Sequence, residues 1–121
     1  MKILIVSGSR ADLGILHCPE KELREDHDVT LLQVHGSTFA EAAHQAPLMF
    51  ASYQPDMVLI LGDRFEIFAL AAQAHLNRIP IAHIGGGDVT EGSYDNAMRD
   101  CISRLSTIHF ATSTFAVSRL V

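Results

Sequence analysis

Apolar residues in this chain fall into short continuous runs separated by longer mixed segments. The runs cover residues 2–6, 28–34, 57–61, 79–84 and 108–111. Short apolar runs rich in β-branched side chains are typical of strands buried on both faces of a parallel sheet. Helical segments follow each run, and the connections are too short for antiparallel pairing. The pattern therefore predicts an α/β fold with a doubly wound parallel sheet and right-handed crossovers.

The segments between the runs carry helix signals. We expect helices over about residues 11–25, 38–52, 65–76, 94–105 and 114–121. Ser37 or Thr38 can cap the second helix, and Ser93 can cap the fourth. Pro47 predicts that the second helix is kinked or divided into two shorter helices.

Length and composition place the chain among ordinary globular proteins. Its 121 residues, 48% apolar and 19% charged, suffice for one domain with one core. Nine basic and fourteen acidic residues give a net charge of −5, which argues against a nucleic-acid surface. No apolar stretch is long enough for a membrane span or a signal peptide, so we expect a cytoplasmic protein that binds no membrane.

Neither the cysteines nor the histidines show the spacing of a metal or redox site. Cys18 and Cys101 stand alone, outside any C-x-x-C motif, and are expected to be reduced thiols. Six of the seven histidines are scattered, without metal-ligand spacing. We expect neither a metal nor a cofactor.

Polar and glycine residues gather where the predicted strands end. In an open parallel sheet these ends line one crevice, which is where ligands bind. Four groups meet there: residues 7–10, 62–64, 83–88 and 113–114, the last including Ser113. Helix N-termini and the fixed charges of Arg10, Arg64 and Arg99 favour a phosphorylated, anionic ligand at this edge. The candidate proton carriers beside it are Asp63, Asp88, Glu91 and Asp95.

Simpler interpretations remain open for several of these residues. Asp63 could serve only as a helix N-cap, with Glu66 three residues later completing a capping box. Arg64 could be a solvated residue at the helix start. Asp95 and Arg99 lie four residues apart and could form only an intrahelical ion pair.

Simpler interpretations also remain open for the fourth predicted strand and the turn after it. His83 lies inside an apolar strand, where a hydrogen-bonded structural histidine is more common than a catalytic one. The three glycines at positions 85–87 do not fit G-x-G-x-x-G, because its third glycine would fall at Thr90. They could form only a tight turn between strand and helix.

Five stretches together resemble the hydrolysing UDP-N-acetylglucosamine 2-epimerases, in the branch that supplies sialic and related nonulosonic acids. They are SRAD at 9–12, LGDRFE at 61–66, IAHIGGGDVTEG at 81–92, YDNAMR at 94–99 and LSTIHF at 105–110. The resemblance implies two Rossmann-like domains in the glycosyltransferase-B arrangement, with a UDP-sugar in the cleft between them. It also implies loss of the C2 proton, departure of UDP from C1, and addition of water to the resulting glycal to give N-acetylmannosamine.

The resemblance also implies roles for individual residues. Asp63 and Asp95 match catalytic carboxylates of the family, and Arg10 and Arg99 match arginines that contact the substrate. Arg64, His83 and Asp88 lie in the motifs with less defined roles; we take the first two as substrate-binding candidates and the third as a catalytic candidate. Ser113 joins the substrate-binding candidates from its place at the crevice.

The chain departs from the family in several places. Gly85 stands where most members carry a glutamate, so Asp88 or Glu91 would have to substitute. Ile15 replaces a frequent lysine. The segment between His35 and Pro55 is expected to be shorter than usual, and residues 1–121 are expected to form the first Rossmann-like domain without the second.

These departures support a second hypothesis. The chain could be a non-catalytic Rossmann-like domain that only binds a sugar nucleotide or another anion, or self-associates as a homodimer through apolar surface. A receiver-like signalling domain is a weaker alternative, because no acidic pair follows the first strand. The sequence does not distinguish UDP from GDP sugars, or hydrolysis from reversible epimerisation.

Overall fold

A computed structural model describes residues 1–87 and 95–120 of the chain. Its strands are β1 (Lys2–Ser7), β2 (Asp28–Gln33), β3 (Met57–Leu61), β4 (Ile81–Ile84) and β5 (Ile108–Phe110). Its helices are α1 (Arg10–Leu23), α2 (Phe39–Tyr53), α3 (Phe65–Leu76), α4 (Asp95–Leu105) and α5 (Thr114–Leu120). All strands pair in parallel in one sheet of order β2-β1-β3-β4-β5. The predicted α/β fold is confirmed.

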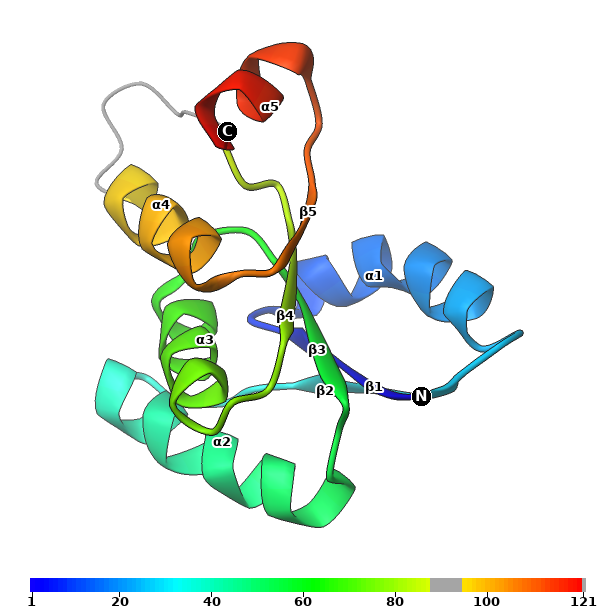
Figure 1. Cartoon of the computed structure of the whole chain (residues 1–121). Helices are drawn as coiled ribbons and strands as arrows, with labels where there is room; N and C mark the ends of the chain where they lie inside the picture. Colours follow the sequence, from blue (N-terminus) through cyan, green and yellow to red (C-terminus); the bar gives the residue numbers. More distant parts are fainter. Residues whose placement is uncertain (88–94, 121) are drawn as a thin grey trace.

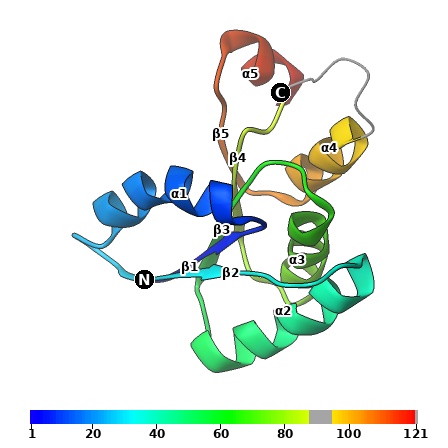
Figure 2. The ribbon, with the colours of Figure 1, turned by 180° about the vertical axis from the view of Figure 1, so that it is seen from behind.

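The order of the strands decides which helices cover which face of the sheet. The chain moves from β1 to β2 in one direction, and from β2 past β1 to β3, β4 and β5 in the other. Right-handed crossovers therefore place α1 on one face and α2, α3 and α4 on the opposite face. Figures 1 and 2 show α1 on one side, and α2, α3 and α4 side by side on the other. The larger core cluster lies beneath these three helices and centres on Val6, Ile60 and Leu70.

The helix signals are confirmed in part. Thr38 caps α2, because its hydroxyl accepts the backbone N–H of Glu41 at 3.1 Å. Pro47 lies inside a single helix, so the division into two shorter helices is wrong. β4 begins at Ile81 rather than at Ile79, because the N–H of Ile79 still bonds to the carbonyl of Ala74 behind it. The predicted cap Ser93 lies outside the described residues.

The face of the sheet that carries α1 is covered over only part of its width. A groove of about 660 Å³ runs between α1 and the neighbouring strands, and its lining is almost entirely apolar. Ile108 and Phe110 of β5 border it and are 41% and 53% exposed. Among the described residues, no helix is long and apolar enough to cross a membrane.

Candidate functional site

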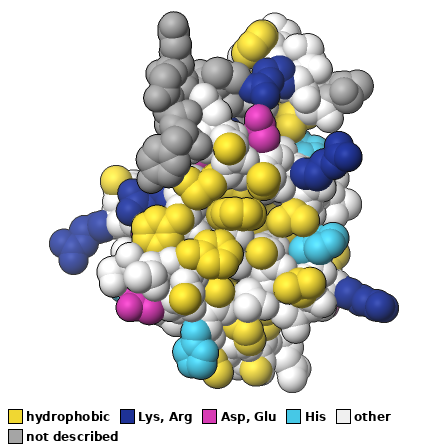
Figure 3. All heavy atoms as spheres, turned by 90° about the vertical axis from the view of Figure 1, so that its left-hand side faces the viewer, with side chains coloured by type: hydrophobic (Ala, Val, Ile, Leu, Met, Phe, Trp, Pro, Cys, Tyr) yellow, Lys and Arg dark blue, Asp and Glu magenta, His cyan; other side chains and the backbone are white. Residues whose placement is uncertain are grey.

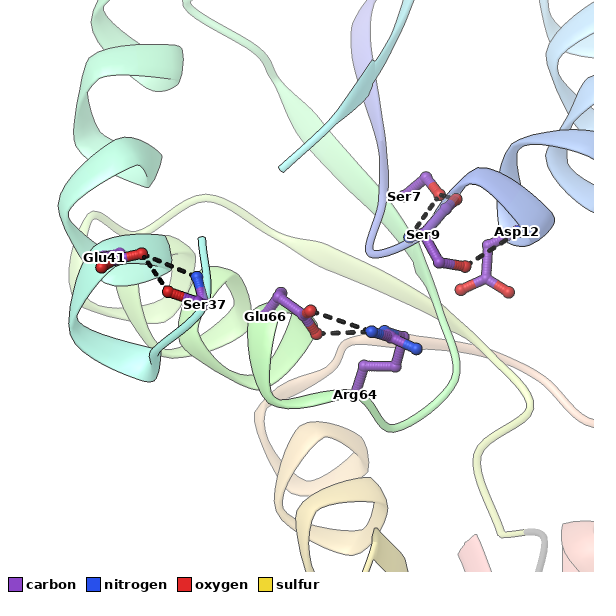
Figure 4. A network of polar contacts seen from close by, with 7 residues as sticks. All are labelled: Ser7, Ser9, Asp12, Ser37, Glu41, Arg64 and Glu66. Carbon is purple, nitrogen blue, oxygen red and sulfur yellow. Dashed lines mark hydrogen bonds and ion pairs between the residues drawn. The ribbon is translucent and has the colours of Figure 1, made fainter. Parts of the chain in front are cut away.

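The carboxyl ends of β1 and β3 lie side by side, and the helices that follow them leave toward opposite faces of the sheet. Such a switch point opens a crevice in doubly wound folds. After β1, the buried Ser7 hydroxyl bonds to the backbone of Ser9, and the Ser9 hydroxyl accepts the N–H of Asp12 at 3.2 Å. Ser9 is therefore the N-cap of α1, and Figure 4 shows this chain of contacts.

Arg64 follows β3, lies beside the turn after β1 and is held by Glu66. Its Nε and Nη2 atoms donate to the two carboxylate oxygens of Glu66 at 3.2 and 3.1 Å, as Figure 4 shows. Glu66 is buried, and its hydrogen bonds raise the pKa of Arg64 above the usual arginine value. Gly8 makes room for this arginine, because a Cβ there would lie 3.2 Å from Arg64 Cδ. The guanidinium is thus a fixed positive charge whose side chain stays 49% exposed.

Asp63 and Arg99 form an ion pair across 36 residues of sequence. Their side chains are only 20% and 10% exposed, so water screens the pair weakly. Arg99 also donates to the side-chain oxygen of Asn96 at 3.2 Å. The pair fixes the start of α4 against the turn after β3 and places a carboxylate beside an arginine at the crevice.

This arrangement corrects one interpretation of Asp63. The N-cap of α3 is Arg64 rather than Asp63, and no side chain completes that cap. The capping box with Glu66 does not form, because the Glu66 carboxylate bonds to Arg64 and the Asp63 carboxylate bonds to Arg99. The position of Asp63 is therefore not explained by helix capping.

His83 lies in β4 with its side chain completely buried. Its Nε2 is 2.7 Å from the carbonyl oxygen of Gly62, and its Nδ1 is 3.3 Å from the hydroxyl of Ser103 on α4. Burial lowers the pKa of His83 below 6.5, and the nearby His109 and Arg99 act in the same direction. The ring is therefore neutral at pH 7. This geometry favours the structural interpretation of His83, while the predicted substrate contact stays a prediction.

The lowered pKa of His83 makes stability depend on pH. Below pH 6.5 the unfolded chain binds a proton at this histidine that the folded chain does not, so the free energy of unfolding falls as the pH decreases from 7 to 5. We expect a contribution of up to about 1.4 kcal/mol per pH unit, measured by urea unfolding. His83→Asn should flatten the profile, because it removes the titrating ring. Equal slopes in the wild type and His83→Asn would contradict this assignment.

The remaining candidates occupy different positions. Arg10 begins α1 with an exposed side chain, and Asp95 begins α4 half-buried. Ser113 is exposed and its hydroxyl accepts the N–H of Ala116 at 3.1 Å, so it caps α5. Asp88 and Glu91 lie outside the described residues. Ser103 was missed by the sequence analysis, although it lies four residues after Arg99 and therefore on the same face of its helix.

The described part of the site offers charge and proton chemistry. Within residues 1–87 and 95–120, no group of three histidine, cysteine or acidic side chains lies close enough to hold a metal ion. The structure brings Arg99 and Asp63 together, and it places Arg10, Arg64 and Asp95 at the starts of α1, α3 and α4. Arginines stabilise a phosphate leaving group, and carboxylates can exchange a proton with carbon or water.

Comparison with known proteins agrees with this chemistry. The sequence model of a family described as UDP-N-acetylglucosamine 2-epimerase matches residues 5–121. A hydrolysing UDP-N,N'-diacetylbacillosamine 2-epimerase of Legionella pneumophila is 31% identical over 160 residues, which cover 99% of this chain and 42% of the relative. A hydrolysing GDP/UDP-N,N'-diacetylbacillosamine 2-epimerase of Campylobacter jejuni is 40% identical over 72 residues, or 60% of this chain and 19% of that protein.

The fold is also found in solved structures. A UDP-GlcNAc 2-epimerase from Neisseria meningitidis, bound to UDP-GlcNAc, superposes with a TM-score of 0.85 at 22% identity, over 99% of this chain and 42% of that one. The chain thus spans less than half the length of the relatives it matches. The Legionella match is longer than this chain, so the relative carries extra residues within the matched region. The predicted shortening between His35 and Pro55 stays a prediction.

Proposed function

The chain belongs to the UDP-N-acetylglucosamine 2-epimerase family, and from this premise we propose that its crevice binds a UDP-sugar and carries part of the hydrolysing 2-epimerase reaction. The observation that supports this most directly is the weakly screened pair of Asp63 and Arg99 at the carboxyl end of β3. A carboxylate that exchanges protons and an arginine that attracts phosphate are the two groups that the reaction requires.

The proposed reaction begins with removal of the proton at C2 of the sugar. The C–H electron pair forms the C1–C2 double bond, the C1–O bond breaks, and UDP leaves with those electrons. Water then adds across the double bond of the glycal: its hydroxyl group bonds to C1 and a proton bonds to C2. The product is N-acetylmannosamine when the donor is UDP-N-acetylglucosamine. Asp63, Asp88 and Asp95 are the proposed proton carriers, of which Asp63 follows β3 and Asp95 begins α4.

Positive charge would bind the diphosphate. Arg10 and Arg64 present exposed side chains at the starts of α1 and α3, and Arg99 is more buried and paired with Asp63. Ser113 is the remaining substrate-binding candidate, whereas the completely buried His83 can act on the site only through its neighbours. Ser113 presents an exposed side chain at the start of α5, and His83 contacts the Gly62 carbonyl from within β4.

Exchange of the C2 proton with solvent tests the proposal. The 121-residue chain is incubated in deuterated water with UDP-N-acetylglucosamine and, separately, with UDP-N,N'-diacetylbacillosamine, because curated relatives are named for both sugars. Proton NMR then follows UDP release and deuterium uptake at C2. Uptake with either sugar supports the proposal and identifies the preferred donor, and no uptake with either contradicts it.

A non-catalytic role is the second candidate, and Gly85 favours it because most family members carry a glutamate there. Such a domain would bind UDP without exchanging the C2 proton. Titration of the chain with UDP, followed by amide chemical shifts of Gly8 and Arg64, separates the two candidates. Shifts without deuterium uptake would indicate a binding domain.

We also propose that the chain forms a homodimer through the groove beside α1. The exposed Ile108 and Phe110 border this groove, and an uncovered apolar sheet face favours self-association. Figure 3 shows that hydrophobic side chains also gather over α2, α3 and α4, where Leu76 is 74% exposed. Sedimentation of Phe110→Lys and Leu76→Lys distinguishes the two faces. Dissociation by Leu76→Lys alone would contradict the groove as the interface.

A further inference from the structure

Two side chains behind the turn after β3, the buried His83 and the half-buried Ser103, connect three segments of the site. A backbone carbonyl can only accept a hydrogen bond, so the contact with Gly62 requires the ring proton of His83 on Nε2. Nδ1 is then an acceptor, and the Ser103 hydroxyl donates to it. The direction of both hydrogen bonds is therefore set by the single carbonyl of Gly62.

The first connected segment is the turn after β3. Gly62 has a φ of +88° and immediately precedes Asp63, so it determines the direction in which the chain leaves the strand. Its N–H bonds to the carbonyl of Ile84 at 3.0 Å and its carbonyl bonds to His83 at 2.7 Å. Both backbone groups of Gly62 are thus tied to β4, and Asp63 follows this anchored residue.

The second segment is the glycine turn after β4. A Cβ at Gly86 would lie 2.7 Å from the Ser103 hydroxyl oxygen and 3.0 Å from Nδ1 of His83. Gly86 therefore rests directly on the two side chains. A larger residue there would push them apart, which accounts for a glycine at a position where the backbone φ does not require one.

The third segment is α4. Ser103 lies one helical turn after Arg99, so α4 is tied to the turn after β3 at two successive points. Arg99 contacts Asp63, and Ser103 contacts Gly62 through His83. Two attachments one turn apart fix both the position and the rotation of the helix that carries Asp95.

We infer that His83 and Ser103 are positioning residues that set the placement of Asp63 relative to Asp95, without touching the substrate. The effect of these residues on the reaction rate rests on the proposed function, whereas their effect on the geometry of the site rests on the structure alone. The side chain of His83 is completely buried, so its effect on the site has to act through Gly62, Gly86 and α4.

The kinetic test uses Ser103→Ala. Loss of the hydroxyl should lower kcat for C2 deuterium exchange by about tenfold or more, because small displacements of reacting groups are costly, while KM changes less than about twofold. Ser106→Ala is the matched control, since its hydroxyl bonds to the carbonyl of Ile102 on the same helix and does not contact His83. Equal kcat values in the two variants, or a raised KM with unchanged kcat in Ser103→Ala, would overturn the inference.

The geometric test does not depend on activity. In the histidine-labelled chain, ¹⁵N spectra should show a protonated Nε2 and an acceptor Nδ1 for His83. Ser103→Ala should shift Nδ1 toward the value of an unbonded acceptor and move the amide signals of Asp63 and Asp95, with a urea midpoint like that of Ser106→Ala. Absence of C2 deuterium exchange in the wild type would contradict the proposed function. Unchanged amide signals of Asp63 and Asp95 in Ser103→Ala would overturn the positioning role.

Discussion

Replacing Asp63 with asparagine is expected to slow C2 deuterium exchange by at least about 100-fold, the contribution typical of a proton-transferring side chain. Asparagine keeps the shape and one hydrogen-bond acceptor for Arg99 but cannot carry a proton to or from carbon. The dissociation constant of UDP should stay the same or decrease, because Arg99 then lacks its compensating negative charge. Exchange rates by NMR and UDP affinity by calorimetry measure the two effects separately.

Asp100→Asn is the matched control for this experiment. Asp100 lies on α4 and forms an ion pair of 3.0 Å with Arg119, so its replacement also removes a carboxylate from an arginine. Its side chain is 47% exposed, and its partner lies on α5. We expect wild-type exchange in Asp100→Asn. Wild-type exchange in Asp63→Asn as well would show that Asp63 serves only as the partner of Arg99.

The sheet and its helices could be predicted because their signals are local. Each buried strand is an unbroken apolar run, and residues 65–76 are apolar enough to mark a buried helix without any knowledge of its neighbours. The same parallel arrangement predicts that the polar residues gather at the carboxyl ends of the strands. Arg10, Asp63 and Arg64 were therefore placed correctly at the carboxyl ends of strands.

The pairings within the site could not be predicted, because they join residues far apart in sequence. Glu66 lies three residues after Asp63, and this spacing predicts a helix N-cap as a possible role for Asp63. The observed partner of Asp63 is Arg99, 36 residues away. The contact of Ser103 with His83 spans 20 residues and has no sequence signature. Capping statistics describe a helix in isolation, and tertiary partners of opposite charge compete with the cap for the same carboxylate.

Gly87→Ala is expected to destabilise the chain more than the same change at Gly62 or Gly14. A Cβ there would meet the carbonyl oxygen of Ala116 on α5 well inside van der Waals contact, and the backbone φ is +83°. The conformational cost is about 1–2 kcal/mol, and overpacking adds about 1–3 kcal/mol. We therefore expect the free energy of unfolding to fall by about 2–5 kcal/mol.

Gly62 and Gly14 separate the two contributions. Gly62 has nearly the same φ, +88°, but nothing lies within 4 Å of its added Cβ, so Gly62→Ala should cost only the conformational part, about 1–2 kcal/mol. Gly14 is inside α1 with open space beside it, and Gly14→Ala should stabilise by about 0.5–1 kcal/mol. Urea unfolding measures all three, and hydrogen exchange of Ala116 reports whether α5 moves. Equal losses for Gly87→Ala and Gly62→Ala, with Ala116 protected in both, would show that α5 does not pack on the glycine turn.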